Sequence, residues 1–293
     1  MAGQKLAVVT GGAGFVGSHL CERLVKEGYR VISLDNYFTG SQENHVPGVE
    51  YREGHTKDIT KLIPEDPDII YHLGEYPRVH KSLEEPALVL DLNCTGTHAV
   101  LEYWRKKGVK LVYTASSTKD DATSKAADGT LGRDLSPYTW TKATNVDLIN
   151  NFARWYTLPY AITYFFGVYG PRERAWGSYG TVVETFRQNV QKGAPHEVNA
   201  PGTQTRAFTH VLDTVEGLFF VGERGAGDGY NICADDVWTI RAVAEAYGGE
   251  ITETPQTKVS RSAVASDTTP LRGLGWEQRH WLKDYIAETK GNA

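Results

Sequence analysis

Apolar and polar residues follow two different periods in the first half of the chain. Short runs rich in β-branched residues predict four strands, at Leu6–Thr10, Arg30–Leu34, Asp68–Leu73 and Lys110–Tyr113. Residues 14–28 and 87–107, which lie between these runs, carry apolar side chains at helical spacing; in the first of them Phe15, Leu20 and Leu24 are expected to share a buried stripe. Strands that alternate with helices of this length form βαβ units, so we predict an α/β fold with a doubly wound parallel sheet.

The second half begins with the same pattern and then becomes less regular. A helix is predicted at Tyr138–Tyr156 and a strand at Tyr160–Phe166. The later elements that we predict are helices near Gly180–Lys192, Thr239–Tyr247 and Trp281–Glu288 and strands at Ala207–Val211 and Gly229–Cys233. We therefore expect residues 1–165 to form the sheet-bearing domain. Residues 166–293 are expected to form mainly a smaller, discontinuous lobe, with some segments returning to the sheet.

Composition and charge exclude several classes of function. The 293 residues carry 31 Lys and Arg against 36 Asp and Glu, a formal net charge of −5, whereas proteins that track nucleic-acid phosphates carry clustered basic residues. The chain begins with a polar segment and contains no run of about 18 apolar residues, so neither secretion nor a membrane span is expected. Cys21, Cys94 and Cys233 lack metal-ligand spacing, and so do the histidines. A cytoplasmic protein with reduced thiols and no metal site is expected.

A glycine-rich turn follows the first predicted strand and opens the first predicted helix. Gly11 permits a tight turn, Gly14 lets the backbone approach a pyrophosphate, and Gly17 permits close packing of the helix on the sheet. Amide groups at the start of such a helix bind phosphates. Asp35 ends the second strand, 18 residues after Gly17, where a carboxylate can accept hydrogen bonds from the ribose hydroxyls of NAD and would repel the 2′-phosphate of NADP. These features predict an NAD site.

Tyr138 and Lys142 are four residues apart and share one face of the helix that is predicted to follow Pro137. A free tyrosine is a poor base at neutral pH because its pKa is about 10, and a neighbouring ammonium stabilises its phenolate. The strand before this helix continues into Ala115–Thr118, where the hydroxyl of Ser116 can hydrogen-bond a substrate alcohol beside the tyrosine. Ser116, Tyr138 and Lys142 are therefore the predicted catalytic residues.

With these motifs in place, the chain resembles the nucleotide-sugar epimerase/dehydratase family of extended short-chain dehydrogenases/reductases, which includes UDP-galactose 4-epimerase. The matching segments extend over nearly the whole chain and include TGGAGFVGSHL, LDNYFTG, YHLGE, SPYTWTK, VYGPRE and HVLD. The resemblance implies a Rossmann-like NAD domain and a C-terminal lobe that holds a nucleotide diphosphate-sugar, for which a UDP-sugar is expected. It also implies a homodimer formed through two helices of each subunit. Nucleic acids and membranes are not expected as partners.

The resemblance also implies roles for individual residues. The cofactor-binding set comprises Gly11, Gly14, Phe15, Val16 and Gly17 at the pyrophosphate, Asp35, Asn36, Thr39 and Gly40 at the adenosine ribose, Asp58 and Ile59 at the adenine, Leu73, Gly74, Glu75 and Asn93 beside the cofactor, Phe166 near the nicotinamide, and Tyr138 and Lys142. The substrate-binding set comprises Ser117, Thr118, Arg206 and Arg261, of which the two arginines would clasp the diphosphate. Ser117 or Thr118 would replace Ser116 as the catalytic hydroxyl if the strand register shifts.

Two positions depart from the family pattern near the expected site. Relatives usually have two small residues after the fourth strand, where this chain has Gly74 and Glu75. A buried glutamate there would add charge near the nicotinamide or contact a sugar hydroxyl. The asparagine expected before VYG is Gly167, which removes a substrate contact.

The resemblance favours NAD-dependent epimerisation of a nucleotide-sugar at C4 through a 4-keto intermediate. Tyr138 would be the base, Lys142 would hold the nicotinamide ribose and lower the tyrosine pKa, and Ser116 would assist. A 4,6-dehydratase would carry an Asp-Glu pair directly after the catalytic hydroxyl, and a 4-ketoreductase a cysteine two places past it, but this chain has Ser117 and Thr118. Both reactions stay open as alternatives, as does a catalytically silent NAD-binding protein.

The segment Thr118–Asp134 connects the catalytic serine to the catalytic tyrosine. Its interior contains one large apolar residue, so little burial offsets the entropy of ordering it. We expect a lid that orders when the nucleotide-sugar binds, with Lys119 or Arg133 near the ligand. The alternative is a solvated insertion without a role.

Overall fold

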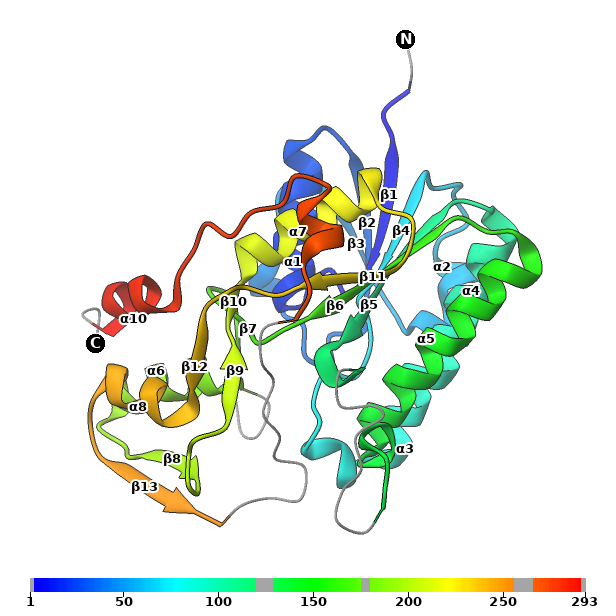
Figure 1. Ribbon diagram of the computed structural model, residues 1–293. Helices are drawn as coiled ribbons and strands as arrows, with labels where there is room; N and C mark the ends of the chain where they lie inside the picture. Colours follow the sequence, from blue (N-terminus) through cyan, green and yellow to red (C-terminus); the bar gives the residue numbers. More distant parts are fainter. Residues whose placement is uncertain (1–2, 120–128, 175–179, 256–265, 291–293) are drawn as a thin grey trace.

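The computed structural model describes residues 3–119, 129–174, 180–255 and 266–290 (Figure 1). Its centre is a seven-stranded parallel sheet in the order β11-β6-β5-β4-β1-β2-β3. The strands are β1 (Leu6–Thr10), β2 (Arg30–Asp35), β3 (Val49–Glu53), β4 (Ile69–His72), β5 (Lys110–Ser116), β6 (Tyr160–Phe165) and β11 (Gly227–Ile232). Every residue of β1 and β4 is buried, as expected for inner parallel strands that helices cover on both faces.

Helices lie on both faces of this sheet (Figure 1). On one face are α1 (Phe15–Lys26) and α7 (Val211–Arg224), and on the other are α2 (Ile59–Leu62), α4 (Gly96–Lys107) and α5 (Pro137–Tyr156). Leu20 and Leu24 of α1 are fully buried, as predicted. The prediction for Phe15 is wrong: it is only partly buried and lines a cavity, because the first turn of α1 projects beyond the end of β1.

The predicted helix over residues 87–107 is present, and its hydrogen-bond pattern changes in the middle. It runs without a break through α3 (Pro86–Val89), a π-helical segment η4 (Leu90–Thr95) and α4. The remaining short helical turns are η1 (Gln42–Asn44), η2 (Thr56–Asp58), η3 (Lys81–Leu83), η5 (Ser117–Lys119), η6 (Gly132–Asp134) and α9 (Thr269–Arg272). The π-helical segment places Asn93 against α5, as described below.

The C-terminal lobe packs around its own small core. Its elements are α6 (Val182–Lys192), β8 (His196–Asn199), β9 (Thr205–Ala207), β12 (Val237–Thr239), α8 (Ile240–Tyr247), β13 (Ile251–Thr254) and α10 (Leu282–Lys290). β8 pairs with β13 and β9 with β12, while β7 (Val168–Tyr169) pairs with β10 (Thr209–His210) near the main sheet. None of the helices in the described ranges is both long and apolar enough to cross a membrane.

Several elements were not predicted from the residue pattern; β3, β8, β13 and α7 are among them. β3 is a partly exposed edge strand whose sequence, VEYRE, is mostly charged or polar. α7 contains Gly217 and Gly222, which lower its intrinsic helix propensity, and is stabilised instead by burial on the sheet. Together α7 and β11 return the chain from the lobe to the sheet.

Candidate active site

A cavity of about 620 Å³ opens at the carboxyl ends of the sheet strands. One wall is formed by the segments that follow β1, β2, β4, β5 and β6, and the opposite wall by residues of the C-terminal lobe such as Asn199, Arg206 and Phe208. In open α/β sheets ligands bind in the crevice outside the carboxyl ends of the strands. The cavity therefore has the place and size expected for a cofactor together with a substrate.

The glycine loop forms one end of the cavity. Gly11, Gly14 and Gly17 all line it. A side chain at Gly17 could not be accommodated, because its Cβ would lie 2.0 Å from the carbonyl oxygen of Gly11. The loop is thus a narrow backbone cradle that opens onto the start of α1, which fits the pyrophosphate of a dinucleotide.

Asp35 ties this loop to the end of β2. Its carboxylate accepts hydrogen bonds from the backbone N–H of Ala13 at 2.9 Å and of Tyr37 at 2.8 Å. Burial raises the pKa of the Asp35 carboxyl above its ordinary value, and the two backbone donors oppose that shift. Asp35 and its neighbours Asn36 and Thr39 line the cavity at the position predicted for the adenosine ribose.

The helix α5 begins where the sequence predicts. Ser136 caps it by accepting a hydrogen bond from the N–H of Thr139, and Pro137 occupies the first helical position. Tyr138 and Lys142 are both buried and both line the cavity. Ser116, the last residue of β5, lines the same cavity. The three predicted catalytic residues are therefore brought to one site.

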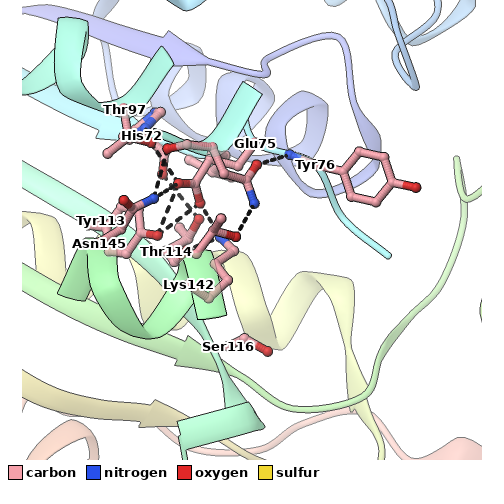
Figure 2. Close-up of polar contacts among 12 residues, drawn as sticks. His72, Glu75, Tyr76, Thr97, Tyr113, Thr114, Ser116, Lys142 and Asn145 are labelled. Atoms are coloured by element: carbon pink, nitrogen blue, oxygen red, sulfur yellow. Dashed lines mark hydrogen bonds and ion pairs between the residues drawn. The ribbon is translucent and has the colours of Figure 1, made fainter. Parts of the chain in front are cut away.

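Glu75 forms a buried ion pair with Lys142 (Figure 2). The side chains of Glu75 and Lys142 are only 1% and 8% exposed. The carboxylate of Glu75 also accepts hydrogen bonds from the hydroxyl of Thr97 at 2.7 Å, the side-chain amide of Asn145 at 2.7 Å and the hydroxyl of Tyr113 at 2.9 Å. Burial by itself raises the pKa of Glu75, but the Lys142 ammonium and these donors outweigh it and hold that pKa below its ordinary value.

Further hydrogen bonds, through Thr97 and His72, orient the donor to the same carboxylate. Because the single hydroxyl proton of Thr97 goes to Glu75, its oxygen accepts from Nε2 of His72 at 2.9 Å. The other ring nitrogen of His72 then accepts from the hydroxyl of Thr10 at 2.7 Å. Burial lowers the pKa of His72 to about 4, so its ring is neutral at pH 7. This arrangement keeps Glu75 supplied with donors and therefore ionised.

Asn93, in the π-helical segment η4, forms hydrogen bonds with residues of the same cluster. Its backbone carbonyl accepts from the side-chain amide of Asn145 at 2.9 Å, its own amide donates to the hydroxyl of Thr141 at 2.9 Å, and its side-chain oxygen accepts from the N–H of Tyr76 at 2.6 Å. Asn93 is fully buried. Its contacts thus join the segment after β4 to α5.

Another charged pair, formed by Arg78 and Glu173, lies in the cavity wall. Arg78, in the segment after β4, and Glu173, after β7, interact electrostatically and both line the cavity. Glu173 accepts hydrogen bonds from the backbone N–H of Thr181 at 2.7 Å and from its hydroxyl at 2.8 Å. Burial raises the pKa of Glu173 to about 7.

Most of the predicted site residues line the cavity. These are Gly11, Gly14, Phe15, Val16, Gly17, Asp35, Asn36, Thr39, Leu73, Gly74, Glu75, Ser116, Ser117, Tyr138, Lys142 and Arg206. Gly40, Asp58, Ile59, Asn93, Thr118 and Phe166 do not belong to its lining. Thr118 instead is buried and donates its backbone N–H to the hydroxyl of Ser116 at 3.3 Å, which favours Ser116 over Thr118 as the reactive hydroxyl.

Two predictions fall wholly or partly outside the described residues. Arg261 is one of them, and residues 120–128, the middle of the predicted lid, are the other. At the end of that segment Arg133 forms an ion pair with Asp147 of α5 at 3.1 Å. The lid stays a prediction.

Sequence reasoning did not identify Tyr76, Arg78, Arg172 and Glu173, which also line the cavity. Arg172 and Glu173 lie in the VYGPRE motif, so the motif itself was the available signal. The departure at Gly167 has a steric reason: a Cβ there would lie 2.1 Å from the carbonyl oxygen of Ala207, so β9 occupies the space of a larger side chain. Within the described ranges, no group of three or more His, Cys, Asp or Glu side chains could hold a metal ion.

Comparison with known proteins agrees with this geometry. Residues 7–233 match the model of the NAD-dependent epimerase/dehydratase family. The chain belongs to this family. Its predicted family and its Rossmann-like fold class are therefore confirmed, and NAD is the cofactor on which the family depends.

Individual members with known structures or activities differ in their reactions. The UDP-glucose 4-epimerase of Thermotoga maritima, solved with UDP-glucose, is 28% identical, with a TM-score of 0.87 over 98% of this chain and 97% of that one. The UDP-glucose 4-epimerase of Thermus thermophilus, solved with NAD, is 26% identical, with a TM-score of 0.86 over 98% of both chains. A UDP-N-acetyl-alpha-D-glucosaminuronate decarboxylase of Bacillus cytotoxicus is 29% identical over 83% of this chain and 79% of that protein. This chain is therefore an enzyme of the NAD-dependent epimerase/dehydratase family, and its relatives include both epimerases and decarboxylases.

Proposed function

We propose that the protein epimerises a UDP-sugar at C4 in an NAD-dependent reaction. The observation that carries this proposal is the convergence of Ser116, Tyr138 and Lys142 in the wall of one cavity that also contains the glycine loop. Arg206 of β9 lines the same cavity and is the proposed partner of the substrate diphosphate. The similarity to UDP-glucose 4-epimerases over nearly the full chain supports this choice.

The residues that would hold NAD fit its chemical groups. The backbone of Gly11, Gly14 and Gly17 leaves space for the pyrophosphate, and the carboxylate of Asp35 is placed for ribose hydroxyls. Lys142 uses two N–H groups on Glu75 and on the carbonyl of Thr114, which leaves its third N–H for the nicotinamide ribose. The chemistry that bound NAD supplies is the reversible uptake of a hydride from a sugar carbon.

The side chains of this protein would transfer the proton and orient the sugar. In its phenolate form, the oxygen of Tyr138 takes the proton of the C4 hydroxyl, and the hydroxyl of Ser116 orients that oxygen. The same phenol returns the proton to O4 after the 4-keto sugar has turned over. General acid–base catalysis of this kind contributes about 10²–10⁴-fold. Holding C4 in one position adds to that through proximity.

Decarboxylation is the second candidate, because UDP-uronate decarboxylases of similar sequence identity are among the relatives. It would begin with the same oxidation at C4 and then release the C6 carboxylate as CO₂. The cavity contains Arg78 beside Tyr138, a cation that could face such a carboxylate. The 4,6-dehydratase and 4-ketoreductase reactions have less support. After the catalytic hydroxyl they use an acidic pair and a cysteine, respectively, and this chain has neither there.

Product analysis with a panel of substrates tests the proposal. The protein is incubated with NAD and with UDP-, GDP-, CDP- and dTDP-hexoses and hexuronates, and the products are identified by NMR. We expect a UDP-sugar and its C4 epimer to interconvert without accumulation of NADH. Conversion of a uronate to a pentose with release of CO₂ would establish the decarboxylase instead. Loss of water from C5–C6 would establish the dehydratase.

A first prediction concerns the choice of cofactor. NAD is expected to bind at least about tenfold more tightly than NADP, because the 2′-phosphate would meet the carboxylate of Asp35, and juxtaposed like charges cost several kcal/mol. Calorimetric titration of the purified protein with each dinucleotide at the same ionic strength measures the ratio. Equal affinities would contradict this role of Asp35.

A second prediction concerns the homodimer that the resemblance implies. Leu90 of η4 and Trp140 and Trp155 of α5 are large apolar residues that are 44%, 42% and 58% exposed. We expect sedimentation velocity to show a dimer, and Trp155→Lys to weaken its association at least about tenfold. Trp281→Lys, which changes a tryptophan that is 41% exposed and lies outside these helices, is the control. A monomeric wild-type protein would contradict the prediction.

A further inference from the structure

Glu75 places a negative charge beside the lysine of the proposed catalytic set. Here the carboxylate and the ammonium are in direct contact and are shielded from solvent. Figure 2 shows the side chains of Glu75, Lys142 and Asn145 pointing toward one another, while Ser116 lies apart from the cluster.

The hydrogen-bond pattern keeps this carboxylate ionised. Lys142 and Asn145 contribute nitrogen donors that cannot act as acceptors, and the hydroxyl protons of Thr97 and Tyr113 are directed to the same two oxygens. A protonated Glu75 would have to donate a hydrogen bond into this ring of donors. These donors, with the ammonium of Lys142, hold the pKa of Glu75 below its ordinary value despite its burial.

The other titratable groups around this pair do not change its charge, because they are neutral or paired with each other. They are His72 on β4, Arg78 after β4, Cys94 on η4, Tyr113 on β5 and Glu173 after β7. His72 is neutral, and burial raises the pKa of both Cys94 and Tyr113, so these two are neutral as well. Arg78 and Glu173 face one another. Lys142 lies four residues from Tyr138 on the same face of α5, so the charged group that neighbours Tyr138 along this helix is the Lys142–Glu75 pair.

We propose that Glu75 is a positioning residue that compensates the charge of Lys142 and thereby moves the pH range in which Tyr138 acts as a base to more alkaline values. The inference rests on the proposed role of Tyr138 as that base. An ammonium stabilises a neighbouring phenolate, and an anion beside the ammonium reduces that stabilisation. Glu75 also fixes the direction of Lys142, since two of its three N–H groups are committed to Glu75 and to the carbonyl of Thr114.

Two readouts in charge-removing variants test the proposal. The first is the pH profile of kcat/KM with the substrate that the panel identifies. The second needs no substrate: it is the alkaline titration of the Tyr138 phenolate by near-ultraviolet difference absorbance, with the matching Tyr138→Phe protein subtracted. In Glu75→Gln both midpoints are expected to fall by about one pH unit, because removal of the anion leaves the full charge of Lys142 beside Tyr138. Because burial raises the pKa of Glu173 to about 7, its titration can also affect the pH profile, so the shift from wild type is compared rather than the absolute midpoint.

A matched control separates charge from packing. Tyr113→Phe removes one donor to the same carboxylate but leaves the charge of Glu75 in place, so its midpoints should remain at the wild-type values. Glu75→Ala is the second charge-removing variant and should show the same fall as Glu75→Gln.

Each remaining outcome decides the question. Unmoved midpoints in both charge-removing variants, or an equal shift in Tyr113→Phe, would overturn the proposal. If neither variant folds, Glu75 is only a structural partner of Lys142 and the proposal also fails. If the phenolate midpoint falls but no sugar in the panel is epimerised, the role of Glu75 stands and the proposed reaction is the part that is wrong.

Discussion

Replacing Tyr138 by phenylalanine is expected to lower kcat by at least about 10²-fold, within the range of general acid–base catalysis. The change deletes one hydroxyl and almost no volume, and the ring can keep its contacts with Tyr76, Val89 and Leu92. The backbone N–H of Tyr138, which donates to the hydroxyl of Ser82 at 3.3 Å, is not altered. The loss should therefore be confined to proton transfer at O4.

The control for this experiment is the binding of NAD, which should stay within about threefold of wild type in Tyr138→Phe. Circular dichroism and the thermal midpoint should also be unchanged, since no buried polar atom is left without its partner. Turnover within tenfold of wild type would show that Tyr138 is not the base. Loss of NAD binding together with turnover would show that the hydroxyl holds the cofactor.

Substitution of Gly17 by alanine is expected to weaken NAD binding at least about tenfold and to lower the free energy of unfolding by about 1–3 kcal/mol. The new Cβ would overlap the carbonyl of Gly11 and lie 2.9 Å from Cα of Gly12, both of which are backbone atoms that cannot rotate away. The loop would have to move from the start of α1. The amides that meet the pyrophosphate would then be displaced.

Gly273→Ala is the matched control, because a Cβ there would make only ordinary contacts, 3.4 Å from the nearest backbone oxygens, and Gly273 has no positive φ. It should leave both NAD affinity and stability within about 0.5 kcal/mol of wild type. Calorimetric titration and urea denaturation measure the two effects. A Gly17→Ala protein that binds NAD as tightly as wild type would contradict the cradle described here.

The sequence alone was sufficient for the parts of the site that are built from local structure. Gly11, Gly14 and Gly17 are recognisable because a tight turn from a strand to a helix restricts the residue type at each position. Tyr138 and Lys142 are recognisable because the helical period places residues four apart on one face. Both features depend on a few neighbouring residues, and the structure brings them together at one cavity.

Residue pattern was less informative where stability comes from distant contacts. The buried helix α7 carries two glycines, and its folding depends on packing against the sheet rather than on propensity. The strand β3 is recognisable only through its pairing with β2, because its side chains are mostly polar. Such elements are specified by their neighbours in space, which the local period does not reveal.

The partner of Lys142 could only be decided by the tertiary structure. From the sequence, Glu75 was expected to add charge near the nicotinamide or to contact a sugar hydroxyl, but its carboxylate is directed to Lys142, Asn145 and Thr97. Thr97 lies on α4 and the other two on α5, between 22 and 70 positions along the chain from Glu75, which follows β4. A buried charge is stabilised only when donors from several elements converge on it, and that convergence is a property of packing, not of spacing. The sequence by itself determined which residue types the site contains. The fold determined which of them form the buried ion pair.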